Sequence, residues 1–145
     1  MNNLEQNLPG IGQKLTTFID ELADRGVSPD FGTDCMTLRW RPENGKSWNL
    51  GSITSKGLVW FDFLGRQAQN AGLLETRDQY LDNLAAGVPN ALVKRYSKVA
   101  STSVATPQNN YIRIDELLAN DERAQGWLRA IEEFQTGVTK FSSAD

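Results

Sequence analysis

Three short runs of hydrophobic and β-prone residues are separated by polar turn signals, and this pattern predicts a β-meander at about 35–63. In the first run Met36, Leu38 and Trp40 alternate with polar residues, as they do in a strand with one buried face. The pair Asn44-Gly45 can supply the positive φ angles of a tight turn, so a hairpin is expected there. The three predicted strands lie at about 35–41, 47–53 and 58–63.

The register of this hairpin stays open. A two-residue turn at Asn44-Gly45 would pair Trp40 with Asn49, which places a tryptophan beside a polar residue. Either the loop is longer and the ladder contains a bulge, or one face of the sheet is mixed. The third run is apolar on both faces except at Asp62, and we expect it to be a central strand or one covered on both sides.

Apolar residues three and four positions apart predict helices before and after the meander. An N-terminal helix at about 9–25 is followed by Gly26, a usual C-terminal cap. Residues 27–34 are expected to form a loop that leads into the first strand. After a short helix or turn at about 66–71, a middle helix is expected to start at Thr76 as its N-cap.

The segment between the middle and last helices is harder to interpret. Residues 91–99 could form a strand or a helical turn, and the small polar residues at about 100–110 predict an exposed loop. One more strand is expected at about 111–114.

The last helix is expected as one piece or as two, at about 115–119 and 121–136. Asp115 or Asn120 could cap it, and Gly137 is a natural stop. Residues 142–145 are expected to form a frayed tail.

These elements predict an α+β fold, in which N-terminal, middle and C-terminal helices pack on an antiparallel sheet of about three to five strands. The last helix should lie across the sheet with Trp127 and Ile131 in the core. The 145 residues fit a single globular domain, 1–145. Its oligomeric state does not follow from the pattern.

Several features of the composition favour a cytoplasmic protein without a membrane span. No apolar run approaches the length of about 18 residues that a membrane helix needs. The first residues have neither the basic start nor the apolar core of a secretory signal. Cys35 is the single cysteine, so no intrachain disulfide can form.

Histidine is absent from the chain, and this excludes several classes of active site. It removes Ser-His-Asp and Cys-His catalysis and the histidine-containing zinc sites. The single cysteine removes four-cysteine zinc and iron–sulfur sites. We therefore predict no cofactor and no metal, and we favour a protein that is not an enzyme.

One arrangement invites comparison with metal-dependent nucleases, in which two carboxylates hold a metal and a lysine assists the attacking water. Asp30, Glu43 and Lys46 are the residues concerned. Glu43 and Lys46 are separated by two residues and not by one, so they cannot share a strand face. A turn flanked by an exposed Glu43–Lys46 pair is the better interpretation.

Charge is distributed unevenly around the net value of −3. Residues 36–66 carry five basic and two acidic groups, and residues 91–113 carry four basic groups and no acidic one. The flanking helical segments are acidic. Either these halves neutralise each other across the fold, or a basic face is kept for an anionic partner.

The candidate binding residues are nine cations and tryptophans from the basic segments. We predict first a non-catalytic interaction or accessory module that binds a protein partner. Nucleic-acid binding through the basic and aromatic strand face comes second, although an acidic domain opposes it. A carboxylate-dependent hydrolase or nuclease comes third. The candidates are Arg39, Arg41, Lys46, Trp48, Lys56, Trp60, Arg66, Lys94 and Arg95.

Overall fold

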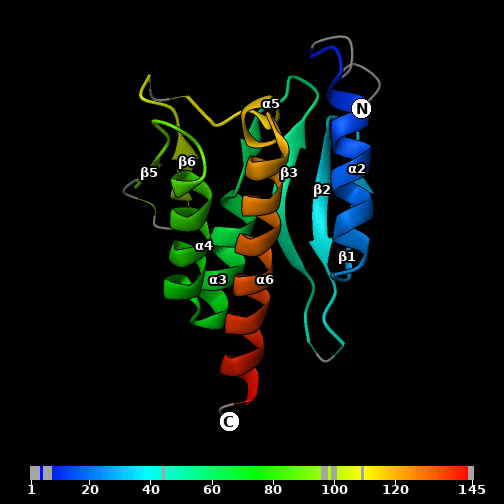
Figure 1. Ribbon diagram of the computed structural model, residues 1–145. Coiled ribbons are helices and arrows are strands. Elements are labelled where there is room, and N and C mark those ends of the chain that lie inside the picture. The colour runs from blue at the N-terminus through cyan, green and yellow to red at the C-terminus, as the bar shows by residue number, and fades with distance from the viewer. Residues whose placement is uncertain are drawn as a thin grey trace.

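The computed structural model describes residues 4, 8–43, 45–95, 98, 101–108 and 110–143, whose arrangement is shown in Figure 1. Five helices in this part of the chain accompany a four-stranded antiparallel sheet and a two-stranded one, so the predicted α+β class is confirmed. The helices are α2 (Ile11–Ala23), α3 (Asp62–Ala71), α4 (Leu74–Ala86), α5 (Ile114–Leu117) and α6 (Asp121–Ser143). The strands are β1 (Val27–Phe31), β2 (Cys35–Trp40), β3 (Trp48–Thr54), β4 (Val59–Trp60), β5 (Leu92–Lys94) and β6 (Ser103–Ala105).

The larger sheet has the order β1-β2-β3-β4, and the segment 111–113 extends it. The N–H of Val59 donates to the carbonyl of Ile112 (2.9 Å), and the N–H of Ile112 donates to the carbonyl of Val104 (3.2 Å). These bonds connect β4 to β6 and thereby join the β5-β6 pair to the larger sheet. The strand predicted at 111–114 is thus present as isolated bridges, because helix α5 begins at Ile114.

Helix α6 lies between α4 and α2 on one side of the sheet (Figure 1), and its apolar face occupies the centre of the core. Trp127 and Ile131 are 1% and 0% exposed, as predicted. Trp127 stacks on Phe18 of α2 with ring centroids 4.6 Å apart. Its indole N–H donates to the Tyr80 hydroxyl on α4 (2.9 Å), which donates to the Leu50 carbonyl on β3 (2.7 Å). One hydroxyl therefore connects two helices and the sheet.

The structure resolves the register that the sequence left open. Trp40 pairs with Trp48, so the loop of the hairpin spans residues 41–47 and is longer than a two-residue turn. The same ladder also shifts by one residue, at a β-bulge on β3. Asn49 supports this bulge, because its Oδ1 accepts the N–H of Gly51 (2.9 Å). The structure therefore contains both the longer loop and the bulge that the sequence left as one alternative.

The loop predicted at 27–34 is wrong, because most of it forms the edge strand β1. The N–H of Gly32 donates to the carbonyl of Cys35 (2.8 Å), and hydrogen-bonded pairs alternate with non-bonded pairs along an antiparallel ladder. Pro29, opposite Leu38, therefore falls at a position whose N–H would point away from β2. A proline at such a position removes no ladder bond, which is why an edge strand tolerates it.

The strand predicted at about 58–63 is too long, since β4 has two residues and α3 begins at Asp62. Val59 and Phe61 are buried while Trp60 is exposed, so the strand has one covered face and not two. From Asp62 the burial period changes to that of a helix, with Leu64 and Ala68 in the core.

The predicted ends of the middle and last helices also differ from the structure. Helix α4 begins at Leu74, two residues before the expected cap Thr76, and α6 continues through Gly137. A Cβ at position 137 would lie 2.9 Å from the Cγ2 of Thr76. Gly137 therefore allows α4 and α6 to approach closely and does not end a helix. Asn120 is confirmed as a cap, because its Oδ1 accepts the N–H of Arg123 (2.9 Å).

The segment predicted as an exposed loop at about 100–110 contains β6, whose three residues are buried. Pairing with β5 and packing against α4 outweigh the low hydrophobicity of this stretch. For 91–99 the strand alternative is correct at Leu92–Lys94, and residues 96, 97 and 99 lie outside the described part.

The predicted frayed tail at 142–145 is helical through Ser143, and residues 144 and 145 are not described. None of the helices in the described part of the chain combines the length and the apolar character that crossing a bilayer requires.

Candidate binding groove

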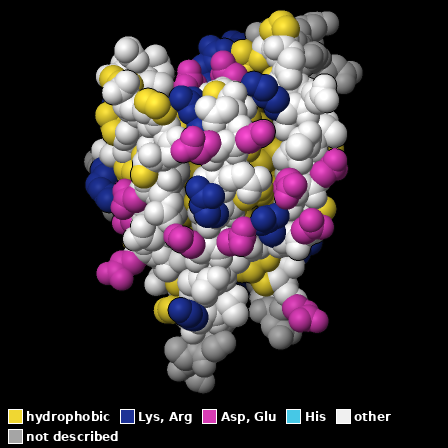
Figure 2. Space-filling view, in the orientation of Figure 1, with side chains coloured by type: hydrophobic (Ala, Val, Ile, Leu, Met, Phe, Trp, Pro, Cys, Tyr) yellow, Lys and Arg dark blue, Asp and Glu magenta, His cyan; other side chains and the backbone are white. Residues whose placement is uncertain are grey.

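A groove of about 680 Å³ lies between the 41–47 loop and the C-terminal end of α6, and we call it the C-terminal groove. Figure 2 shows it as a notch between these two projecting elements, with hydrophobic side chains at its base. It contains Arg41, Lys46 and Trp48, three of the residues that the sequence predicts for binding. Its lining is completed by Trp40, Pro42, Glu43, Gly45, Ala71, Leu73, Val138, Thr139 and Phe141.

The floor of the groove is held rigidly by aromatic packing. Trp40 and Trp48 lie side by side because they pair directly across β2 and β3, and each is 7% exposed. Both rings meet Phe134 of α6 edge-on, at centroid distances of 6.3 Å and 5.4 Å. Such edge-to-face pairs add stability beyond the burial of their area. The Trp48 proposed for binding is therefore mainly a core residue, and only its margin reaches the groove.

Apolar side chains at the mouth of the groove are more accessible than its floor. Phe141, near the end of α6, is 48% exposed, although α6 places it one turn beyond the buried Val138. Leu73, where α3 gives way to α4, is buried on the other side. An accessible aromatic beside a covered apolar floor is the arrangement found at small hydrophobic binding sites.

Arg41 belongs to the lining of the groove, but its guanidinium is held by the edge strand β1 on the other face of the sheet. Its guanidinium donates to the Ser28 hydroxyl (2.9 Å) and to both carboxylate oxygens of Asp30 (3.3 and 3.2 Å). Lys46, on the same loop, forms no ion pair with another residue that the structure describes. Within the described part of the chain, the charge of Arg41 is thus paired on the other face, and Lys46 is the cation that the loop offers to the groove.

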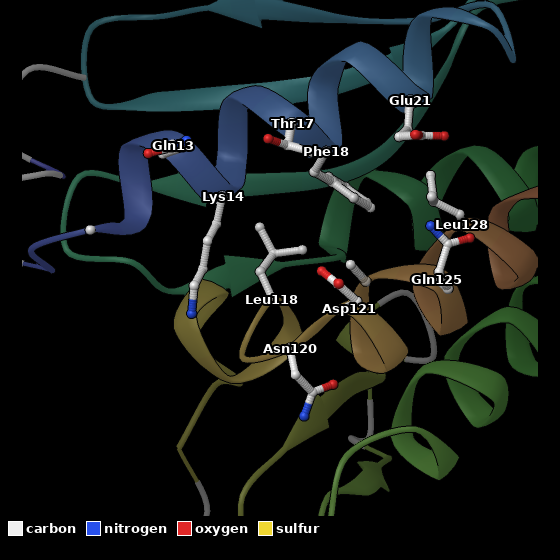
Figure 3. A pocket seen from close by; sticks show the side chains of 12 residues that line it. Gln13, Lys14, Thr17, Phe18, Glu21, Leu118, Asn120, Asp121, Gln125 and Leu128 are labelled. Atoms are coloured by element: carbon white, nitrogen blue, oxygen red, sulfur yellow. The ribbon is translucent and has the colours of Figure 1, made fainter.

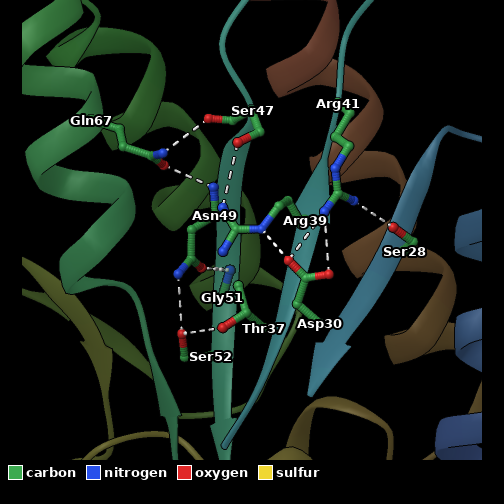
Figure 4. Close-up of polar contacts among 10 residues, drawn as sticks. All are labelled: Ser28, Asp30, Thr37, Arg39, Arg41, Ser47, Asn49, Gly51, Ser52 and Gln67. Carbon is green, nitrogen blue, oxygen red and sulfur yellow. Dashed lines mark hydrogen bonds and ion pairs between the residues drawn. The ribbon is translucent and has the colours of Figure 1, made fainter. Parts of the chain in front are cut away.

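The face of the sheet away from α6 and α2 carries a polar network, shown in Figure 4. Asp30 stands between Arg39 and Arg41 and accepts hydrogen bonds from both. These bonds, that of Arg39 first, hold the pKa of the Asp30 carboxyl below its usual value of 3.8. The acidic helices therefore do not cover the Arg39/Arg41 face; a carboxylate on the neighbouring strand partly neutralises it.

Gln67 of α3 bonds the part of the β3 edge that β4 leaves unpaired, as Figure 4 also shows. Its Oε1 accepts the N–H of Asn49 (2.8 Å) and its Nε2 donates to the carbonyl of Ser47 (3.0 Å). β4 pairs with β3 only at Ser52 and Ile53. The side-chain amide therefore satisfies the backbone groups that a longer β4 would have bonded, and it fixes α3 beside the groove.

The remaining predicted binding residues are dispersed. Lys56 is exposed in the turn at the far end of β3, and Trp60 is 43% exposed and packs against Tyr111 at 5.6 Å between ring centroids. Arg66 lies over the ring of Phe63, 4.5 Å from its centroid. Lys94 is on β5, and Arg95 forms an ion pair with Asp78 (3.4 Å). These residues do not converge with the C-terminal groove.

A second depression, of about 570 Å³, lies between α2 and the start of α6 (Figure 3). Phe18, Leu118 and Leu128 form its base, and its rim is mostly polar. The ammonium of Lys14 donates to the carbonyl of Ala119 (3.2 Å), which satisfies a backbone group after α5. Sequence reasoning did not find this depression, because its polar residues belong to elements far apart in the chain.

The residues considered for a nuclease site do not form one and have other contacts in the structure. Asp30 is engaged by two arginines, and Glu43 and Lys46 lie on the hairpin loop. Among the described residues no cluster of three or more cysteine or acidic side chains could hold a metal ion.

Sequence reasoning missed the contribution of α6 to the C-terminal groove. Val138, Thr139 and Phe141 all follow Gly137, which the sequence indicated as a helix stop. The spacing of Phe134, Val138 and Phe141 continues the apolar stripe of the helix and is the signal that could have identified them.

Comparison with known proteins finds no matching family model, and neither a curated protein nor a solved structure matches the chain.

Proposed function

We propose that the protein is a non-catalytic interaction module that binds a segment of a protein partner in the C-terminal groove. The observation that carries the proposal is the convergence of Trp48, Lys46 and the exposed Phe141 around one concavity of about 680 Å³. Aromatic side chains around a small apolar depression are typical of the residues that dominate protein–protein affinity.

The rigidity of the groove also supports this function. The Trp40–Trp48 pair is held by Phe134, which meets both rings edge-on. Side chains that are already ordered lose little conformational freedom when a partner binds. A cytoplasmic location is part of the proposal and rests on the single cysteine of the chain.

A displayed library of short random peptides tests the proposal and does not require that the partner be identified first. Immobilised protein should enrich a family of related peptides, and Phe141→Ser should abolish their binding because it removes the accessible apolar contact. Phe31→Ser is the matched control, since Phe31 is 68% exposed at the opposite end of the sheet. Failure to enrich any peptide, or equal losses in both variants, would refute binding in this groove.

Nucleic-acid binding through the strand face is the second proposal. Its specific support is Trp60, which is accessible beside Tyr111 and could stack on a base. The pairing of Asp30 with Arg39 and Arg41 reduces the positive charge available for phosphates. A gel shift of a single-stranded oligonucleotide at low salt, lost in the Arg39→Ala/Arg41→Ala variant, is the expected result, and no shift at low salt would refute it.

A further inference from the structure

A row of side chains crosses the sheet on the face away from α6 and α2, and we call it the cross-strand row. Side chains of residues that pair directly across antiparallel strands lie on the same face of a sheet. Asp30 pairs with Thr37, and Thr37 pairs with Ser52. Trp60 is the partner of Ser52 on β4, and it packs against Tyr111 of the adjoining segment 111–113. The row therefore runs from a carboxylate through two hydroxyls to an aromatic pair.

The aromatic end of the cross-strand row is an open platform. Trp60 is 43% exposed, and its ring centroid lies 5.6 Å from that of Tyr111 at an interplanar angle of 41°. Rings at this separation are in contact, so a ligand lies on them and does not enter between them. The electron-rich faces of such rings attract the positively polarised C–H bonds of an apolar surface placed over them.

The cations beside this platform have partners within the chain. Arg113, two residues after Tyr111, pairs with Asp115 (3.0 Å). Arg66 lies over the ring of Phe63. A single strand of nucleic acid needs cations along its phosphates as well as rings for its bases. The charge near the platform therefore favours an uncharged ligand over a polyanion.

The polar end of the cross-strand row has more capacity to accept hydrogen bonds than to donate them. The Asp30 side chain is 42% exposed, and its carboxylate accepts three hydrogen bonds from Arg39 and Arg41 out of the about four that a carboxylate can accept. The Thr37 hydroxyl shares one hydrogen bond with that of Ser52 (3.4 Å) and retains a lone pair. A ligand bound here must therefore supply donors. Phosphodiesters and proline-rich peptides lack such donors, whereas sugar hydroxyls both donate and accept.

We infer that the cross-strand row binds a neutral saccharide, with the C–H face of one sugar ring on Trp60 and Tyr111 and hydroxyls directed to Thr37 and Asp30. An apolar contact with a few polar groups that fix orientation is the usual composition of a small-ligand site. Neighbouring strands lie about 4.8 Å apart, so the three steps from Trp60 to Asp30 span about 14 Å, which suits an oligosaccharide. This site is separate from the C-terminal groove and does not depend on the function proposed for it.

Titration of the full chain with neutral cello-, xylo-, manno-, malto- and chitooligosaccharides tests this assignment. Binding should change less than about twofold between low and high salt, because it involves no ion pair with the ligand. Trp60→Ala should weaken it at least about tenfold, and Thr37→Val about threefold to tenfold through the loss of one hydrogen bond. Phe63→Ala is the matched control, because Phe63 is a 55% exposed aromatic outside the row, and the affinity should stay within about twofold.

Tryptophan fluorescence reports on the platform directly. The other three tryptophans, Trp40, Trp48 and Trp127, are each at most 7% exposed. Acrylamide should therefore quench chiefly the emission of Trp60, and a bound oligosaccharide should protect it. Trp60→Phe should remove the quenchable signal while the circular dichroism spectrum stays unchanged.

Every outcome of the titration decides for or against a saccharide. Binding of at least one oligosaccharide that Trp60→Ala weakens and Phe63→Ala does not would support it. Absence of binding, or equal losses in the two variants, would overturn it. So would Trp60-dependent, salt-sensitive binding of oligothymidylate in place of any saccharide, since the face would then belong to a nucleic acid. Phe141→Ser should leave saccharide binding unchanged, so failure of this site and failure of the C-terminal groove are observed separately.

Discussion

Removal of the Tyr80 hydroxyl should destabilise the fold strongly, because one oxygen connects α4, α6 and β3. It accepts the indole N–H of Trp127 (2.9 Å) and donates to the Leu50 carbonyl (2.7 Å), and all three residues are at most 1% exposed. Burial raises the pKa of the Tyr80 phenol well above its usual value of 10.0, so the group stays protonated and remains a donor.

Tyr80→Phe keeps the ring and its edge-on contact with Phe61 but leaves a donor and an acceptor without their partner. Each unsatisfied buried group costs about 1–3 kcal/mol, and partial relaxation reduces the sum, so we expect a loss of about 2–4 kcal/mol. A domain of this size has a stability of about 5–15 kcal/mol. The variant should therefore fold, with a clearly lower denaturation midpoint.

Urea titration followed by circular dichroism measures this loss, with the slope m unchanged if the native state is intact. A double-mutant cycle with Trp127→Phe isolates the hydrogen bond between the two side chains. Tyr80→Phe should cost about 1–2 kcal/mol less in the Trp127→Phe background, because the donor is already absent. A single-variant loss under about 1 kcal/mol, or additivity of the two changes within about 0.5 kcal/mol, would refute this account.

Three further changes test the roles assigned to other residues. Gln67→Ala should lower the free energy of unfolding by about 1–3 kcal/mol in the same titration, because the N–H of Asn49 and the carbonyl of Ser47 lose their partner. An unchanged midpoint would contradict this role. Gly137→Ala should destabilise the wild type by about 1–3 kcal/mol, because the added methyl group would meet Thr76. In a Thr76→Ala background the same change should stabilise the fold by up to about 1 kcal/mol. Equal effects in both backgrounds would exclude the contact as the cause. Asp30 has a lowered pKa in the folded state, so its contribution is complete above pH 3.8 and is lost as the pH falls through its folded pKa. The stability difference between wild type and Asp30→Asn should vanish on acidification, and a difference that persists in acid would exclude this ion-pair mechanism.

The candidate site was only partly accessible to sequence reasoning. The basic and aromatic character of the hairpin identified Arg41, Lys46 and Trp48, which do converge. Phe141 and the rest of the second wall were missed, because α6 returns to the hairpin from almost a hundred residues farther along the chain. Local patterns carry no information on which distant helix end will lie beside a given loop.

Side-chain periodicity by itself determined the fold class, the burial of Trp127 and Ile131, and the existence of the strands at Cys35–Trp40 and Trp48–Thr54. These features depend on residues close together in the sequence. The alternation of apolar and polar residues in a strand, or the apolar stripe of a helix, decides which face is buried in the core.

Only the tertiary structure decided how the hairpin is used. Cross-strand pairing placed Trp40 against Trp48 and packing against Phe134 buried both, so the tryptophans became the floor of a groove and not a stacking surface. Asp30 partly neutralised the arginine face from β1, a strand that the sequence did not predict because it contains Pro29. The same packing brought Lys46 and Phe141, which are almost a hundred residues apart in the chain, to one groove. Such outcomes depend on contacts between segments distant in sequence, whose free energies no local pattern contains.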